Sequence, residues 1–84
     1  MIDHKELEQI RYYPLPYRIR RLRRLFCLSQ TEFANRLGTS QTTVAYWETG
    51  RANISERYMD RIISEFGLPL DFFLDIEVQR MRKA

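Results

Sequence analysis

Residues 30–50 read QTEFANRLGTSQTTVAYWETG, and the arrangement of the whole domain can be worked out from them. Near the centre stands Gly38, where a short reversal of the chain needs a positive φ that glycine adopts without steric cost. Thr39 or Ser40 can then cap a new helix, because a hydroxyl accepts a hydrogen bond from the unpaired amides of the first turn. The stretch therefore predicts two helices joined by a tight turn.

Apolar residues on both sides of Gly38 recur at helical spacing, i to i+3 or i+4, which places them on inward faces. They are Phe33, Leu37, Val44 and Trp47. Ala34 is small enough for the backbones of two helices that cross at roughly 90–120° to approach closely. The residues left on the outward face of the second helix are Gln41, Thr42, Ala45 and Tyr46.

The segment before this pair predicts two more helices. Asp3 and Glu6 resemble a capping box, and the short helix that they open must stop before Pro14, because proline excludes the preceding residue from helical geometry. Pro16 suits the first turn of the next helix, where its missing amide would be unpaired anyway. The expected buried stripe of that second helix consists of Ile19, Leu22, Leu25 and Phe26.

The segment after Gly50 predicts a fourth helix capped by Asn53 or Ser55 and a fifth that starts at Pro69. The fifth carries apolar residues at helical spacing: Leu70, Phe73, Leu74, Val78 and Met81. No strand pattern is present, so the predicted class is all-α. We expect residues 1–15 to form an N-terminal helix and proline hinge, residues 16–75 the main domain with its helical pair at 30–49, and residues 76–84 a tail.

Composition limits the class of protein. With 84 residues the chain forms one small domain, and no apolar run reaches the eighteen or so residues of a membrane span. The N-terminus shows no secretory signal and Cys27 is the single cysteine, so we expect a cytoplasmic protein. The net charge is only +3, but five arginines fall between Arg18 and Arg24. Such a concentration of positive charge favours a polyanionic partner.

The spacing of several short motifs resembles the Cro and repressor type of helix-turn-helix domain from phage and bacterial regulators. The resemblance runs from about Ile19 to Leu74 and is carried by IRRLRRLFCLSQTEFANRLGTSQTTVAYWETGRANI at 19–54. It implies a compact five-helix Cro/repressor-like domain, here with an additional short N-terminal helix. It also implies double-stranded DNA as the partner and association with the nucleoid.

Reading bases in the major groove needs side chains that match donor and acceptor edges on a helix narrow enough to enter. Gln41 is the strongest candidate, because one amide can both accept from and donate to an adenine edge. Thr42, Ala45 and Tyr46 are the other candidate base contacts. The candidate phosphate contacts, which have a hydroxyl, amide or guanidinium donor, are Gln30, Ser40, Thr43, Thr49, Arg51 and Asn53.

The resemblance assigns two further roles. In the family, the glutamine that matches Gln30 contacts phosphate and braces the residue that matches Gln41, and an arginine matching Arg23 pairs with a glutamate matching Glu48. The other arginines of the helix that carries Arg23 lie away from its buried stripe, so we expect them to form a solvated face. One or two of these arginines should contact DNA; they are Arg18, Arg20, Arg21 and Arg24.

Cys27 stands where the family usually has glycine in the turn before the second helix of this domain. We expect a small, buried and inert thiol there rather than a redox sensor. The sequence shows no catalytic apparatus, since His4 is alone and no acidic residues gather at metal-ligand spacing. The sequence therefore predicts that the protein is not an enzyme and that it binds no cofactor and no metal.

We therefore predict that the protein is a sequence-specific transcriptional regulator, a repressor that binds a palindromic operator as a homodimer. Dimerisation is expected to use the C-terminal apolar stripe. One alternative is an antitoxin that autoregulates its operon and holds a toxin; a toxin or an antirepressor would then be the protein partner. A second alternative is a protein-interaction module that kept the fold without reading DNA.

Overall fold

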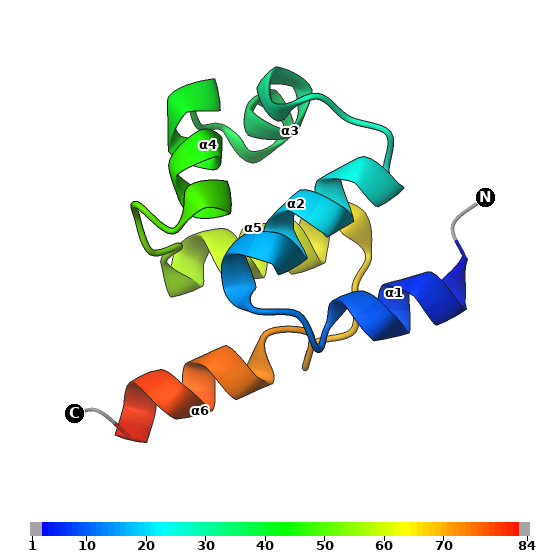
Figure 1. Cartoon of the computed structure of the whole chain (residues 1–84), viewed down its shortest axis with the longest axis vertical. Coiled ribbons are helices and arrows are strands. Elements are labelled where there is room, and N and C mark those ends of the chain that lie inside the picture. Colours follow the sequence, from blue (N-terminus) through cyan, green and yellow to red (C-terminus); the bar gives the residue numbers. More distant parts are fainter. Residues whose placement is uncertain (1–2, 83–84) are drawn as a thin grey trace. The chain divides into compact units, whose positions relative to one another are not determined.

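The computed structural model describes residues 3–82, which form six α-helices and no strand (Figure 1). The helices are α1 (His4–Ile10), α2 (Leu15–Leu25), α3 (Gln30–Leu37), α4 (Gln41–Thr49), α5 (Glu56–Phe66) and α6 (Leu74–Arg82). The all-α prediction is confirmed. The chain divides into two units: residues 1–53, with α1 to α4, and residues 54–84, with α5 and α6. No helix within residues 3–82 has both the length and the apolar character needed to cross a membrane.

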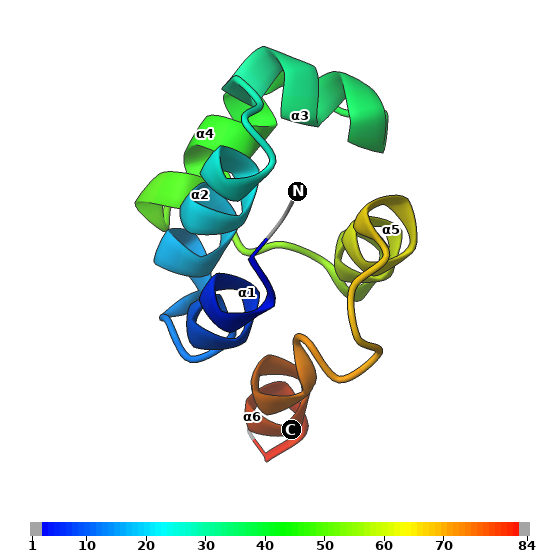
Figure 2. The ribbon, with the colours of Figure 1, turned by 90° about the vertical axis from the view of Figure 1, so that its right-hand side faces the viewer.

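In the first unit α3 and α2 both pack on α4, and α1 packs on α2 (Figures 1 and 2). Its buried apolar residues are Ile10, Ile19, Leu22, Phe33, Ala34, Leu37, Val44 and Trp47. The inward positions predicted on either side of Gly38 are thus confirmed. Leu25 and Phe26, expected in the buried stripe of α2, are only half-buried, because both stand at the exposed end of that helix.

Local hydrogen bonds fix where α3 and α4 begin. Ser29 and Glu32 form a capping box, in which each side chain accepts from the other residue's backbone amide at 3.0 and 2.9 Å. Gly38 adopts the left-handed conformation at φ 73° and ends α3. Ser40 then caps α4 by accepting from the amide of Thr43 at 3.1 Å. The glycine turn predicted from the sequence is present.

Arg18 is buried, so its predicted place on a solvated face is wrong. Its Nε and Nη2 atoms donate to the backbone oxygen of Tyr13 at 3.1 and 2.9 Å. A guanidinium can leave water when its donors find such acceptors, since burial of an unpaired charge is very costly. Arg18 thereby ties the proline hinge to α2.

Cys27, which follows the end of α2, is exposed, so the prediction of a buried thiol is wrong. It adopts φ 58° and is the one residue other than glycine in the described range with a positive φ. Its amide donates to the oxygen of Arg24 at 2.9 Å, and the amide of Leu28 donates to that of Arg23 at 3.2 Å. This is a Schellman ending, in which Cys27 occupies the position that glycine usually takes.

In the second unit Ser55 caps α5, as expected, and Gly67 in the left-handed conformation ends it. The helix predicted from Pro69 begins only at Leu74, because residues 70–73 form tight turns. The amide of Phe72 donates to the oxygen of Pro69, and that of Leu74 to Asp71, both at 3.0 Å. The turns allow Phe72 and Phe73 both to be buried, edge to face at 5.0 Å, and they leave Leu70 89% exposed.

Candidate nucleic-acid interface

An ion pair whose carboxylate is fully buried joins α2 to α4. Arg23 Nε donates to Glu48 Oε2 at 2.7 Å, and Arg23 Nη2 donates to Glu48 Oε1 at 3.0 Å. Arg23 Nη1 also donates to the backbone oxygen of Leu28 at 2.8 Å, in the turn that leads to α3. One guanidinium therefore fixes the end of α2, the start of α3 and the last turn of α4 relative to one another.

The surroundings of Glu48 keep its carboxylate ionised. Burial raises the pKa of Glu48, but hydrogen bonds from Arg23 and Gln30 and the positive charges of Arg23 and Arg20 outweigh it, so the pKa lies below its ordinary value. Arg20 contributes through its Nε atom, 3.4 Å from Glu48 Oε1. At neutral pH the site therefore has a buried anion that can only accept hydrogen bonds.

From this anion a chain of amides runs outward to the first turn of α4. Gln30 Nε2 donates to Glu48 Oε1 at 3.2 Å, and Gln41 Nε2 donates to Gln30 Oε1 at 2.6 Å. Because a carboxylate only accepts, the Gln30 amide must face Glu48 with its nitrogen and Gln41 with its oxygen. The orientation of the Gln41 amide then follows: its nitrogen is turned to Gln30.

Gln41 consequently offers a defined pattern to a ligand. Its side chain is exposed, its Oε1 is available to accept, and one of its two amide hydrogens is not used by Gln30. An adenine presents a donor at N6 and an acceptor at N7 in the major groove, which matches an oxygen and an N–H on one amide. The structure thus brings together Gln41 and Gln30, the two residues that the resemblance links.

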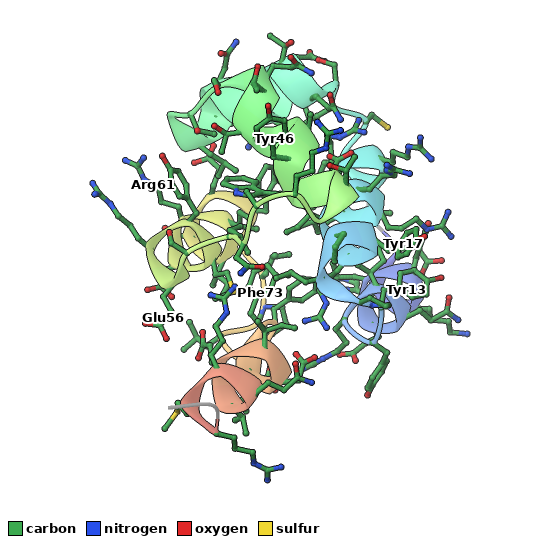
Figure 3. All side chains as sticks on the ribbon, turned by 60° about the vertical axis from the view of Figure 1, so that its left-hand side comes forward. Tyr13, Tyr17, Tyr46, Glu56, Arg61 and Phe73 are labelled. Atoms are coloured by element: carbon green, nitrogen blue, oxygen red, sulfur yellow. The ribbon has the colours of Figure 1, made fainter. Side chains whose placement is uncertain are left out.

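The other candidate base contacts share the outward side of α4. Thr42 is exposed and Ala45 is half-buried. Tyr46 is 41% exposed (Figure 3). The guanidinium of Arg51 lies over its ring, 5.8 Å from the centroid. This contact restricts the ring and places a positive charge beside it.

The candidate phosphate contacts differ in how free their donors are. Arg51 and Asn53 are exposed after the end of α4. Ser40 Oγ and Thr43 Oγ1 lie 2.9 Å apart, so one of the two hydroxyls donates to the other. The Thr49 hydroxyl donates to the backbone oxygen of Ala45 at 3.0 Å, inside its own helix, so its hydrogen points away from solvent.

Sequence reasoning missed two contributions to this surface. Arg20 was grouped with a solvated face, although its contact with Glu48 makes it part of the chain that ends at Gln41. The position of Arg20 three residues before Arg23, on the same face of the helix, is the sequence signal that could have separated it from Arg21. The Ser29–Glu32 capping box, by contrast, has the recognisable pattern of serine followed three residues later by glutamate.

Comparison with known families agrees with this geometry. The family model described as Helix-turn-helix matches residues 19–73, which include α2 from Ile19 onward and all of α3, α4 and α5, and leave α1 and the proline hinge outside. No curated protein and no solved structure matches the chain significantly. The match covers more than half of the sequence, and the pair α3 and α4 lies within it. The chain therefore belongs to the helix-turn-helix family of DNA-binding transcriptional regulators.

Proposed function

We propose that the protein is a repressor that recognises a palindromic operator as a homodimer, with α4 in the major groove and Gln41 reading an adenine. The observation that carries the proposal is the chain of contacts from Arg23 and Glu48 through Gln30 to Gln41. It holds a bidentate amide in one orientation before DNA is present, so that little side-chain freedom is lost on binding.

A homodimer is supported by the apolar residues that α6 leaves exposed. Leu74, Val78 and Met81 repeat at i, i+4 and i+7 and are 51%, 38% and 74% exposed. A single recognition helix contacts only a few base pairs, and two half-sites related by a two-fold axis supply the missing specificity. The half-site centres would then lie about 10–10.5 base pairs apart, or a multiple of this.

The operator can be found by selecting bound duplexes from a random library and sequencing them. We expect an enriched palindrome, two protomers per duplex by native mass, and loss of expression from a reporter promoter that carries the site. A single unrepeated half-site bound by one protomer would overturn the homodimer. Increased expression from the reporter would overturn the role as a repressor.

The contribution of α6 can be measured with Val78→Asp, which places a charge within the apolar stripe. The dissociation constant of the dimer should rise at least about tenfold, since burying an unpaired carboxylate is strongly unfavourable. Glu8→Gln, an exposed change on α1, is the control. A Val78→Asp protein that dimerises as tightly as the parent would exclude α6 as the interface.

The exposed stripe also suits the antitoxin alternative, in which α6 holds a toxin. The two readings differ in the state of the isolated protein. A protein that remains monomeric both in solution and on DNA would favour the antitoxin.

A further inference from the structure

Two cavities that share Arg21 and Arg24 lie along α2, one against the proline hinge and one against α1, on a part of the molecule that the family match covers only partly. The larger, about 370 Å³, is lined by Tyr13, Pro14, Tyr17, Arg20, Arg21 and Arg24. The smaller, about 250 Å³, is lined by Glu6, Arg21, Arg24 and Leu25. We call the two together the hinge groove. The larger cavity alone falls in the range of small-molecule sites, about 300–1,000 Å³.

The hinge groove has free positive charge. Arg18 and Arg23 use their donors inside the first unit, but Arg21 and Arg24 form no ion pair with any residue in the described part of the chain. Both are exposed and both line the two cavities. Glu6 is the single acidic residue among the lining side chains, so the groove stays positive and favours an anion.

The aromatic wall of the hinge groove is held in place. Arg18 clamps the backbone oxygen of Tyr13, and the Tyr13 amide donates to Ile10 at 3.0 Å. Arg21 lies over the Tyr13 ring at 5.7 Å from its centroid. Tyr17 is 60% exposed, and Figure 3 shows both tyrosines on the same side of the molecule. An exposed ring beside unpaired arginines suits a ligand that has both a planar ring and an anionic group.

The hinge groove is separate from the surface that carries Gln41. Successive helical residues are about 100° apart, so Arg21 and Arg23 lie on opposite sides of α2. Arg23 faces Glu48 on α4, whereas Arg21 faces Tyr13 beside α1. Bases read by α4 therefore do not fill the groove, so it can take a separate small ligand.

We propose that the hinge groove binds a nucleoside monophosphate. The base stacks on Tyr17 in the larger cavity, and the phosphate accepts from Arg21 and Arg24 where the two cavities meet. A sugar hydroxyl donates to the carboxylate of Glu6 in the smaller cavity. Tyr17, the two arginines and Glu6 thus each have a counterpart in one small molecule.

Arg20 connects this site to the DNA-reading network. It lines the larger cavity, and its Nε lies 3.4 Å from Glu48 Oε1, the atom that also accepts from Gln30. A phosphate that attracts Arg20 removes one partner of Glu48 and loosens the support of Gln41. This link, unlike the binding site itself, rests on the proposed function. The nucleotide should therefore weaken operator binding.

Titration calorimetry of the full chain with AMP tests the site, with adenosine and inorganic phosphate as partial ligands. AMP should bind at least about tenfold more tightly than either, because ring and phosphate each contribute. The double variant Arg21→Gln/Arg24→Gln should lose at least about tenfold in AMP affinity. Lys5→Gln/Arg57→Gln, with the same change of charge at exposed positions outside the groove, should retain it.

Tyr17→Ala should weaken AMP but not inorganic phosphate, and Tyr12→Ala, an exposed tyrosine outside the lining, should change neither. Equal losses of AMP affinity in the two charge variants would overturn the site. So would a lack of AMP binding at concentrations up to about tenfold above the millimolar upper end of the range usual for small ligands. A short single-stranded oligonucleotide that binds where AMP does not would assign the groove to nucleic acid instead.

Operator binding measured by fluorescence anisotropy tests the link. Saturating AMP should weaken it by about fivefold or more, the lower range of coupling between two sites, and Arg20→Gln should abolish the effect. Unchanged operator affinity at saturating AMP would overturn the link and leave the site standing. A protein that selects no operator would instead contradict the proposed function, whatever AMP does.

Discussion

Gln41 Nε2 lies 2.6 Å from Gln30 Oε1, so the first residue of α4 is hydrogen-bonded to the first residue of α3. Gln30 is held in turn by Glu48, whose carboxylate is buried and paired with Arg23. The side chain that we propose reads a base is therefore supported from the interior of the domain.

Replacement of Gln41 by alanine should cost about 1–3 kcal/mol on the selected operator and almost nothing on random duplexes, because phosphate contacts supply most non-specific affinity. Both duplexes are titrated at one fixed salt concentration. Gln9→Ala, an exposed glutamine on α1, provides the comparison. An equal loss on operator and random DNA would mean that Gln41 does not discriminate sequence.

Replacement of Glu48 by alanine should lower the free energy of unfolding by about 3–5 kcal/mol, because the partly buried guanidinium of Arg23 loses its counter-charge. Denaturant titration measures the change. Glu65→Ala removes an exposed carboxylate on α5 and should have a smaller effect. If Glu48→Ala melts like the parent, the carboxylate is solvated in solution and the proposed support of Gln41 is lost with it.

The pH dependence of stability should show the ionised state of Glu48. Its pKa in the folded protein lies below the ordinary value of 4.5, so its contribution is complete above about pH 4.5 and is lost as the pH falls through the lower, folded value. Glu48→Gln cannot titrate. The stability difference between parent and Glu48→Gln should therefore shrink as the pH falls below about 4.5, and a constant difference would contradict the assignment.

Cys27→Gly should stabilise the domain by roughly 0.5–1 kcal/mol. The left-handed conformation costs a non-glycine residue about 1–2 kcal/mol, and the added freedom of glycine in the unfolded chain offsets part of the gain. Cys27→Ala keeps the strain and tests whether loss of the thiol alone matters. Thermal melts that rank alanine at or above glycine would show that the backbone of this turn is not strained.

The parts of the fold that are set by local interactions were predictable. Gly38 ends α3 and Ser40 caps α4 because each needs only its immediate neighbours. The burial of Arg18 was not predictable, because it depends on the backbone oxygen of Tyr13, which the hinge brings within hydrogen-bonding distance. In a helix with five arginines, sequence spacing alone does not separate the buried member from the solvated ones.

The C-terminal segment shows a second limit. Leu70, Leu74 and Val78 fit a helical period, but the tight turns at residues 70–73 break the register that this period assumes. Burial of the adjacent rings of Phe72 and Phe73 favours the turns, and such a preference depends on the packed core rather than on spacing. The candidate recognition residues on α4 were found because one continuous helix carries them.

The fixed polarity of the Gln30 amide has an evolutionary consequence. Since Gln30 turns its oxygen toward residue 41, that position accepts most readily a side chain that can donate a hydrogen bond. An acidic residue there would face the oxygen of Gln30, and rotating the Gln30 amide would break its contact with Glu48. We therefore expect relatives that have diverged in operator preference to vary at positions 42, 45 and 46 before they place aspartate or glutamate at position 41.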